Sequence, residues 1–104
     1  PIKFLDISED VQYSVHLGII SFKDIDEKKH REIFSRLRQR NIGVQLHYSP
    51  VHLQPLYRKM GFSKGQFPAS ERYSISSLSL PLFPELSSNM QENIVCCLKY
   101  IINN

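Results

Sequence analysis

Hydrophobic and polar positions change their spacing several times along the chain, and the first regular pattern is that of a strand. Between residues 13 and 22, apolar residues alternate with polar or small ones, which predicts a strand buried on at least one face. The alternation returns over residues 44–48 and, briefly, over residues 78–80, and a proline closes each segment. Residues 1–12 show no clear period, and we expect them to form an extended lead-in segment.

A helical period follows the first predicted strand. Apolar side chains recur at helical spacing over residues 33–37, after Asp24 or Asp26, either of which can cap the helix. The helix should end at Asn41 or just before it, because asparagine tolerates the left-handed conformation that closes helices. Ile42 can then fold back on the last turn.

A long loop with little regular pattern separates the second and third predicted strands. Residues 49–68 hold three of the six prolines and two of the four glycines. This composition indicates an excursion with a short helical turn within residues 53–60. Residues 69–77 are expected to be helical. Excursions of this length in a compact domain are usually functional.

A final helix is predicted near the end of the sequence. Ser87 or Ser88 can cap it, and an apolar stripe along residues 90–102 should cover a sheet. The order of elements predicts the α/β fold class. We expect a small two-layer domain in which a short, mainly antiparallel sheet of about three strands is covered by helices.

Composition narrows the class of protein. The 104 residues are 41% hydrophobic and 22% charged with a net charge of +3, which is typical of one globular domain and excludes a disordered chain. The apolar runs are far shorter than the roughly twenty residues that a membrane span needs. A domain of this size has little room for a large enclosed cavity, so a deep active site would need a second domain. Adjacent Cys96 and Cys97 lack metal or redox spacing, which favours free thiols and a cytoplasmic setting.

The densest group of polar and aromatic side chains lies in residues 47–57, where a predicted strand ends and the long loop departs. The segment supplies two imidazoles, two phenols and an amide, and strand ends are where α/β folds place ligands. Alternatively, these side chains only pack locally in a loop braced by prolines. Metal binding is disfavoured, since His47 and His52 have no third ligand near them in the sequence. His16, on a strand face, and His30, on a solvated helix, are weaker candidates.

The basic stretch over residues 28–40 is a second candidate, because it could contact phosphates. Acidic residues interleave with it, and the charges lie around an amphipathic helix, which favours a solvated helix face. A stand-alone basic module that binds nucleic acid or another partner is therefore the alternative to an enzyme domain. Binding to a phosphate backbone would weaken steeply with added salt.

Several separated motifs follow one another in a fixed order. They are Asn41-Ile42-Gly43-Val44-Gln45-Leu46-His47-Tyr48, Pro50-Val51-His52-Leu53-Gln54-Pro55-Leu56-Tyr57, Gly61-Phe62, Phe67-Pro68-Ala69-Ser70-Glu71 and Leu78-Ser79-Leu80-Pro81-Leu82-Phe83-Pro84. Together they resemble the C-terminal domain of the DegT/StrS family of sugar aminotransferases, and the likeness covers residues 13–102.

The resemblance implies the small domain of a fold-type-I enzyme that uses pyridoxal 5'-phosphate to move an amino group from glutamate onto a nucleotide-linked keto-sugar. It also implies an N-terminal large domain that carries the cofactor lysine, and an active site between the subunits of a homodimer. Residues 13–104 would form the small domain after the lead-in of residues 1–12. No lysine here matches the family's cofactor motif, so this fragment should be inactive and free of cofactor by itself. Neither nucleic acid nor a membrane is an expected partner.

The resemblance also implies roles for individual residues. His47 matches the histidine that faces the cofactor and the sugar, while Tyr48, His52 and Gln54 match the loop that walls the nucleotide-sugar site. The motifs look most like those of members acting on UDP-4-keto-6-deoxy-N-acetylhexosamines, on the route to surface sugars such as pseudaminic acid. Asn41 stands where the family usually has glycine. On this interpretation the His47 imidazole should face an open surface and not the core.

Overall fold

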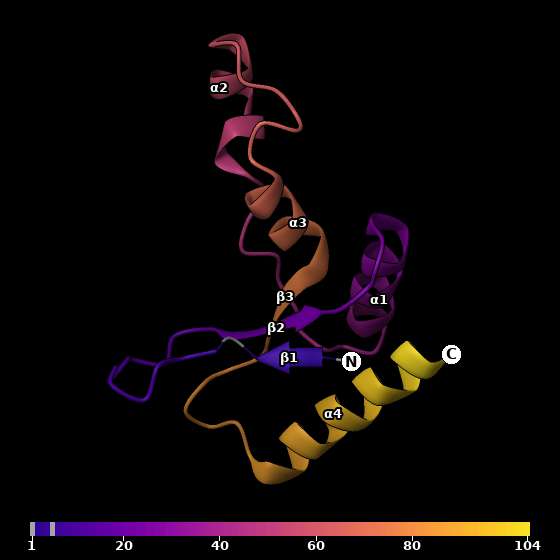
Figure 1. Cartoon of the computed structure of the whole chain (residues 1–104). Helices are drawn as coiled ribbons and strands as arrows, with labels where there is room; N and C mark the ends of the chain where they lie inside the picture. The colour runs from indigo at the N-terminus through magenta and orange to yellow at the C-terminus, as the bar shows by residue number, and fades with distance from the viewer. Residues whose placement is uncertain (1, 5) are drawn as a thin grey trace.

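The computed structural model describes residues 2–4 and 6–104, and in this part of the chain three strands form one antiparallel sheet in the order β1-β2-β3 (Figure 1). This part of the chain also forms four α-helices and one short 3₁₀ helix. In chain order the elements are β1 (Ile2–Phe4), β2 (Gly18–Phe22), α1 (Glu27–Gln39), η1 (Val51–Leu53), α2 (Pro55–Lys59), α3 (Pro68–Ser76), β3 (Ser77–Leu80) and α4 (Ser88–Asn103). The expected α/β class, with a small antiparallel sheet of three strands and covering helices, is confirmed.

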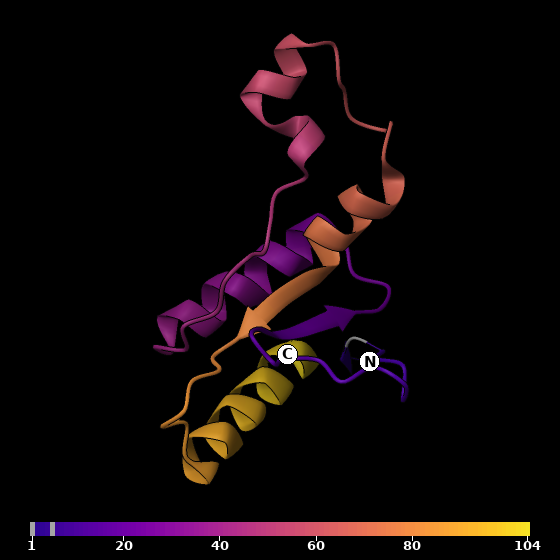
Figure 2. The same ribbon diagram turned by 90° about the vertical axis from the view of Figure 1, so that its left-hand side faces the viewer.

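The hydrophobic core lies between one face of the sheet and the helices α1 and α4 (Figures 1 and 2). Ile20 of β2 pairs with Leu78 of β3, and Phe22 follows two residues later, so the three side chains share this face. The helices supply buried residues at helical spacing, as their sequence periods predict. The buried core consists of Ile20, Phe22, Ile33, Leu37, Ile42, Val44, Leu78, Ile94, Leu98 and Ile101.

Both ends of α1 follow from its sequence. The Asp26 side chain accepts a hydrogen bond from the Lys29 N–H at 2.7 Å, which makes Asp26 the N-cap. At the other end, Asn41 has φ +60°, and the Ile42 N–H donates to the Leu37 carbonyl at 3.1 Å. This is a Schellman closure, in which Ile42 and Leu37 are both buried. The predicted left-handed position and the return of Ile42 are confirmed.

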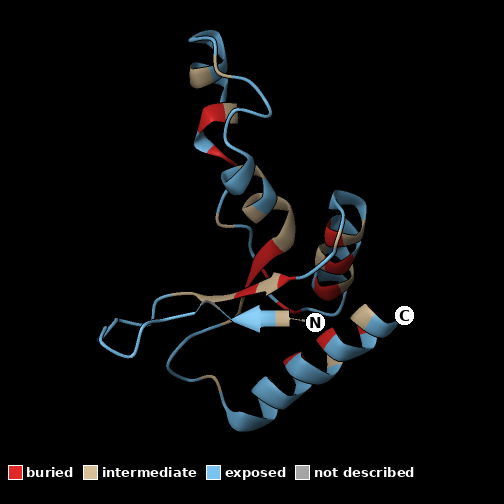
Figure 3. Cartoon of the chain, viewed as in Figure 1, coloured by how far each residue is buried: buried red, intermediate tan, exposed pale blue. Residues whose placement is uncertain are grey.

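Residues 49–67, which we call the arm, extend away from the sheet and carry η1 and α2 (Figures 1 and 2). Gly61, at φ +98°, ends α2, and the Phe62 N–H donates to the Tyr57 carbonyl at 3.1 Å. Most of the arm is exposed, and its buried residues are His52 of η1 and Pro50 just before it (Figure 3). The predicted excursion with a short helical turn is confirmed, and the chain returns to the sheet through α3.

The strand boundaries differ from those expected. The strand predicted over residues 13–22 begins only at Gly18, and Val15 is 61% exposed. The lead-in, expected to hold no strong element, contains β1, which pairs with β2. The β1 strand has three residues, too few to show a period, and β2 supplies the edge that orders it.

Residues 44–48 do not form the strand that their alternation predicts. The segment has a single bridge, in which Gln45 and Ser79 exchange backbone hydrogen bonds at 3.1 and 2.8 Å. The pairing stops there because the chain turns away from β3 into the arm. The third strand of the sheet is therefore β1 and not this segment.

His30 also lies elsewhere than expected, because the sequence placed it on a solvated helix face. It is 3% exposed, and its Nε2 atom lies 2.9 Å from the Ser77 carbonyl oxygen. His30 shares the buried stripe of α1 with Ile33 and Leu37, at spacings of three and seven residues. The charged residues on the rest of the helix hid this position.

Candidate functional site

The extended segment of residues 44–48 separates two cavities. Gln45 and His47 line the first cavity, whereas Leu46 and Tyr48 line the second. Successive side chains of an extended chain point to opposite sides. The alternation that suggested a strand thus places neighbouring residues in different cavities.

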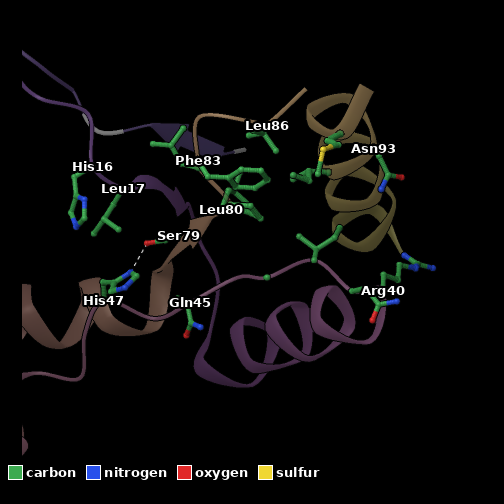
Figure 4. Close-up of a pocket in the computed structure, with 17 residues that line it drawn as sticks. His16, Leu17, Arg40, Gln45, His47, Ser79, Leu80, Phe83, Leu86 and Asn93 are labelled. Carbon is green, nitrogen blue, oxygen red and sulfur yellow. Dashed lines mark hydrogen bonds between the residues drawn. The ribbon is translucent and has the colours of Figure 1, made fainter. Parts of the chain in front are cut away.

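The first cavity has a volume of about 680 Å³ and lies between the end of β3, the 44–48 segment and the start of α4. Its polar end contains His16, Gln45, His47 and Ser79, and its far end contains Arg40 and Asn93 (Figure 4). Apolar side chains line the space between these ends. They are Leu80, Leu82, Phe83, Leu86, Met90 and Ile94.

His47 is held in a defined orientation within this cavity. Its Nδ1 atom lies 2.7 Å from Oγ of the buried Ser79, and its ring contacts the Tyr48 ring edge-on at 4.7 Å between centroids. The residue is half-buried and lines the cavity, so its imidazole is not sealed in the core. Within the described residues Nε2 has no hydrogen-bond partner. This atom is the one left for a ligand.

The second cavity, of about 590 Å³, lies between the arm, α3 and the start of α1. Tyr48 and Gln54 line it, and Tyr48 is 72% exposed. Arg31, Lys64 and Arg72 add positive charge to its wall, but Arg31 is paired with Glu27, and Glu71 adds negative charge. The phenol, the amide and the two cations outside that pair can bind a polar or anionic ligand.

His52 lies in neither cavity lining and is 7% exposed. Its Nε2 atom lies 2.9 Å from Oε1 of Glu71, and its ring packs against Phe67 at 4.8 Å. The hydrogen bond from His52 lowers the pKa of the Glu71 carboxyl, and the Gly65 and Phe67 N–H groups lower it further against the opposing effect of burial. His52 therefore joins the arm to α3 and faces neither cavity.

The four predicted site residues are thus divided among three environments. His47 faces the first cavity, Tyr48 and Gln54 face the second, and His52 is buried between the arm and α3. Sequence reasoning missed Ser79 as a partner of His47. The available signal was a lone polar residue between Leu78 and Leu80 of a short buried strand.

The first cavity does not fit covalent attachment of pyridoxal phosphate by this chain. The cofactor requires a lysine for its Schiff base, and none of the described residues lining the cavity is a lysine. The lining therefore offers groups that can bind and orient a ligand, and no amine that could bond to the cofactor. No cluster of three or more potential metal ligands occurs among the residues that the structure describes.

Several basic side chains of α1 form salt bridges with glutamates of the same helix. Lys29 and Arg36 both approach Glu32, at 3.4 and 3.1 Å, and Arg31 pairs with Glu27. These pairs leave less free charge for a phosphate backbone than the sequence suggests. In the described part of the chain, no helix combines the length and apolar character that crossing a membrane requires.

The chain is a small two-layer α/β domain in which the half-buried His47 faces an open cavity, and comparisons with known proteins give the family. The profile of the DegT/DnrJ/EryC1/StrS aminotransferase family matches residues 2–99. The chain belongs to this family.

Individual relatives agree with the family assignment. The spore coat polysaccharide biosynthesis protein SpsC of Bacillus subtilis is 30% identical over 92% of this chain and 25% of its own length. The UDP-4-amino-4-deoxy-L-arabinose–oxoglutarate aminotransferase of Shewanella sediminis is 31% identical over 70% of this chain and 20% of its own length. The chain therefore spans about a quarter or less of the length of these relatives.

Solved structures share the fold. The Streptococcus pneumoniae protein Spr1654, described as a sugar aminotransferase, superimposes in its PLP form with a TM-score of 0.92 and 25% identity. The match covers 98% of this chain and 26% of that protein.

Proposed function

We propose that this chain is the small domain of a pyridoxal-phosphate-dependent sugar aminotransferase and that its first cavity holds the sugar of a nucleotide-linked substrate. The observation that carries the proposal is the His47 side chain. Ser79 occupies its Nδ1 atom, and Nε2 remains available in an open, partly apolar cavity. A sugar presents hydroxyl groups and apolar C–H faces, and this lining suits both.

The proposed chemistry of this chain is binding and positioning. The His47 Nε2 atom hydrogen-bonds a hydroxyl or keto oxygen of the sugar, either as donor or as acceptor according to the ring tautomer. Tyr48 and Gln54 contact the nucleotide portion from the second cavity. His52 acts behind them by holding the arm in place. The apolar wall limits water around the reacting centre.

The proposed substrate is a UDP-linked 4-keto-6-deoxy-N-acetylhexosamine, with glutamate as the amino donor. The names of the relatives support a nucleotide sugar, because one refers to a UDP-linked amino sugar and one to polysaccharide biosynthesis. The motifs around His47 and His52 are the basis for the finer choice. A role in making surface polysaccharides or nonulosonic acids follows from that substrate.

The proposed assembly supplies what this chain does not. An N-terminal large domain would carry the cofactor lysine, and two subunits would form the active site as a homodimer. Residues 13–104 would be the small domain in this arrangement. The whole enzyme is proposed to act in the cytoplasm. A cytoplasmic setting is compatible with a nucleotide-sugar substrate and with free thiols such as that of Cys96.

The test is His47→Ala in the complete enzyme, with sugar-nucleotide affinity and cofactor affinity measured separately. Loss of one hydrogen bond predicts about two- to tenfold weaker binding of the UDP-sugar and little change for the cofactor. Val95→Ala, an exposed change on α4 outside both cavities, is the control. An unchanged sugar dissociation constant and unchanged turnover in His47→Ala would remove the assignment.

A further inference from the structure

A single oxygen of Glu71 connects the two ends of the arm. Its Oε1 atom lies 2.9 Å from Nε2 of His52, near the start of the arm, and 2.7 Å from the backbone nitrogen of Gly65, near the end. Glu71 itself belongs to the first turns of α3, outside the arm. The two points that it joins are thirteen residues apart in the sequence but meet at one atom.

The arm has little apolar burial to hold it in shape. A short row of aromatic rings runs through it, with Tyr57 and Phe62 at 6.1 Å and Phe62 and Phe67 at 6.2 Å between centroids. Val51, Leu56 and Met60 are exposed, and Leu53 is only half-buried. Segments with so few buried contacts open locally at low free-energy cost unless polar contacts restrain them.

The two contacts of Glu71 are hydrogen bonds to a carboxylate, which are stronger than hydrogen bonds between neutral groups. A carboxylate can only accept, so the His52 Nε2 atom must carry a hydrogen and donate it, which a neutral imidazole can do. The side chains of His52 and Glu71 are 8% and 15% exposed, so water competes weakly for the pair. The Gly65 N–H adds a second charge-assisted hydrogen bond.

The clamped residues adjoin two residues of the second cavity. Gln54 follows His52 by two positions, Lys64 directly precedes Gly65, and both line that cavity. Gly65 has φ +96°, a conformation that glycine adopts without strain, which lets its N–H turn toward Glu71. The position of the clamp therefore determines where Gln54 and Lys64 stand.

We propose that Glu71 is a positioning residue that clamps the arm closed through His52 and Gly65 and thereby sets the arm side of the second cavity. Closure of the arm is a property of this chain alone. Its consequence for ligand binding rests on the proposed function. The two parts can therefore fail separately.

The test of the clamp is amide hydrogen exchange and NMR of this chain with Glu71→Ala and Glu71→Gln. In Glu71→Ala, the Gly65 N–H signal should shift and exchange at least about tenfold faster, together with other arm amides, while amides of β2 and α4 keep their protection. Glu71→Gln retains an acceptor oxygen and should restore part of the protection. Glu32→Ala, which removes a carboxylate paired on α1, is the matched control and should leave the arm unchanged.

Two results would overturn the clamp. One is unchanged exchange of the Gly65 N–H in Glu71→Ala. The other is an equal loss of protection in the arm and the core, which would make Glu71 a general stabilising residue. If Glu71→Ala does not fold, the clamp is tested by trypsin cleavage at Arg58, Lys59 and Lys64 in Glu71→Gln. The clamp requires that trypsin cut these sites faster than in the unchanged chain, and equal rates would overturn it.

Ligand binding is tested separately with uridine diphosphate as the probe. Glu71 also lines this cavity, so losing its negative charge would by itself strengthen binding of the anionic probe. The clamp and the proposed function together predict the opposite, namely weaker binding in Glu71→Ala with recovery in Glu71→Gln. An arm that opens without any change in probe affinity would support the clamp and overturn the assignment of the second cavity to the nucleotide.

Discussion

The Nδ1 atom of His47 lies 2.7 Å from Oγ of Ser79, although 32 positions separate the two residues in the sequence. The backbone bridge between Gln45 and Ser79 brings the segments together, and His47 follows Gln45 on the same side of the chain. Ser79 is buried in β3, which pairs with β2 along its length. The orientation of the imidazole is thus set by a buried residue of the sheet.

Substitution of Ser79 by alanine should release the His47 ring without removing it. We expect about two- to tenfold weaker sugar-nucleotide binding in the complete enzyme, because one hydrogen bond that orients the ring is lost. The nitrogen chemical shifts of His47 should also change, since the tautomer is no longer set by a partner. Calorimetry and ¹⁵N NMR measure the two effects.

Ser21→Ala is the matched control for this change. Ser21 lies in the same sheet and its Oγ is 2.9 Å from Oγ of Ser77, but it lines neither cavity. Its loss should leave the His47 signals and sugar binding in place. Equal effects of the two serine variants would mean that sheet stability, and not the contact to His47, accounts for the result.

Local sequence patterns predicted the elements that form mainly through interactions between neighbouring residues. The closure of α1 at Asn41 could be predicted, because asparagine tolerates the left-handed conformation at a helix end and the apolar residue after it folds back on the last turn. Pairing between distant segments could not be predicted. The β1 strand exists because β2 offers an edge, and the 44–48 segment stops after one bridge because the arm departs.

The candidate site shows the same division. His47 was identified from its motif and its place at the end of a predicted strand, and the structure puts it in an open cavity. The partners Ser79 and Glu71 could not be inferred from the sequence around His47 and His52, because both come from later elements. The alternation of apolar and polar residues over 44–48 indicated the two sides to which the side chains point, although the backbone forms only one bridge with β3.

Replacement of His30 by alanine should destabilise the domain by about 2–4 kcal/mol, because it leaves a cavity in the core and removes the donor to the Ser77 carbonyl. Urea unfolding of this chain measures the change. His16→Ala, at an exposed position, is the control and should cost less than about 0.5 kcal/mol. A cost for His30→Ala as small as that of the control would contradict the buried hydrogen bond.

Acid should weaken the Glu71 clamp. The pKa of Glu71 is lowered in the folded chain, by the His52 hydrogen bond first, so its ordinary value of 4.5 applies only to the unfolded chain. The stabilisation is therefore complete above about pH 4.5 and is lost as the pH falls through the lower folded pKa. The difference in unfolding free energy between the unchanged chain and Glu71→Gln should shrink over that interval.

A control is needed here because the pKa of Glu32 is also lowered, chiefly by the hydrogen bond from Lys29 and with help from Arg36. Glu32→Gln should alter overall stability in a similar acidic range. The Gly65 amide signal separates the two groups, since it should titrate with Glu71 in Glu32→Gln and lose that titration in Glu71→Gln. A Gly65 signal that stays constant through this range in the unchanged chain would rule out the contact.

The closure of α1 predicts a stabilising substitution at Asn41. The residue has φ +60°, a conformation that costs most side chains about 1–2 kcal/mol and glycine almost nothing. Asparagine avoids part of this cost, so Asn41→Gly should raise the unfolding free energy by a few tenths to about 1 kcal/mol, whereas Asn41→Ala should lower it by about 1 kcal/mol. Urea unfolding of the three chains distinguishes them. Because the Ile42 N–H to Leu37 contact depends on this turn, an alanine variant at least as stable as the glycine variant would show that the turn does not impose the left-handed conformation.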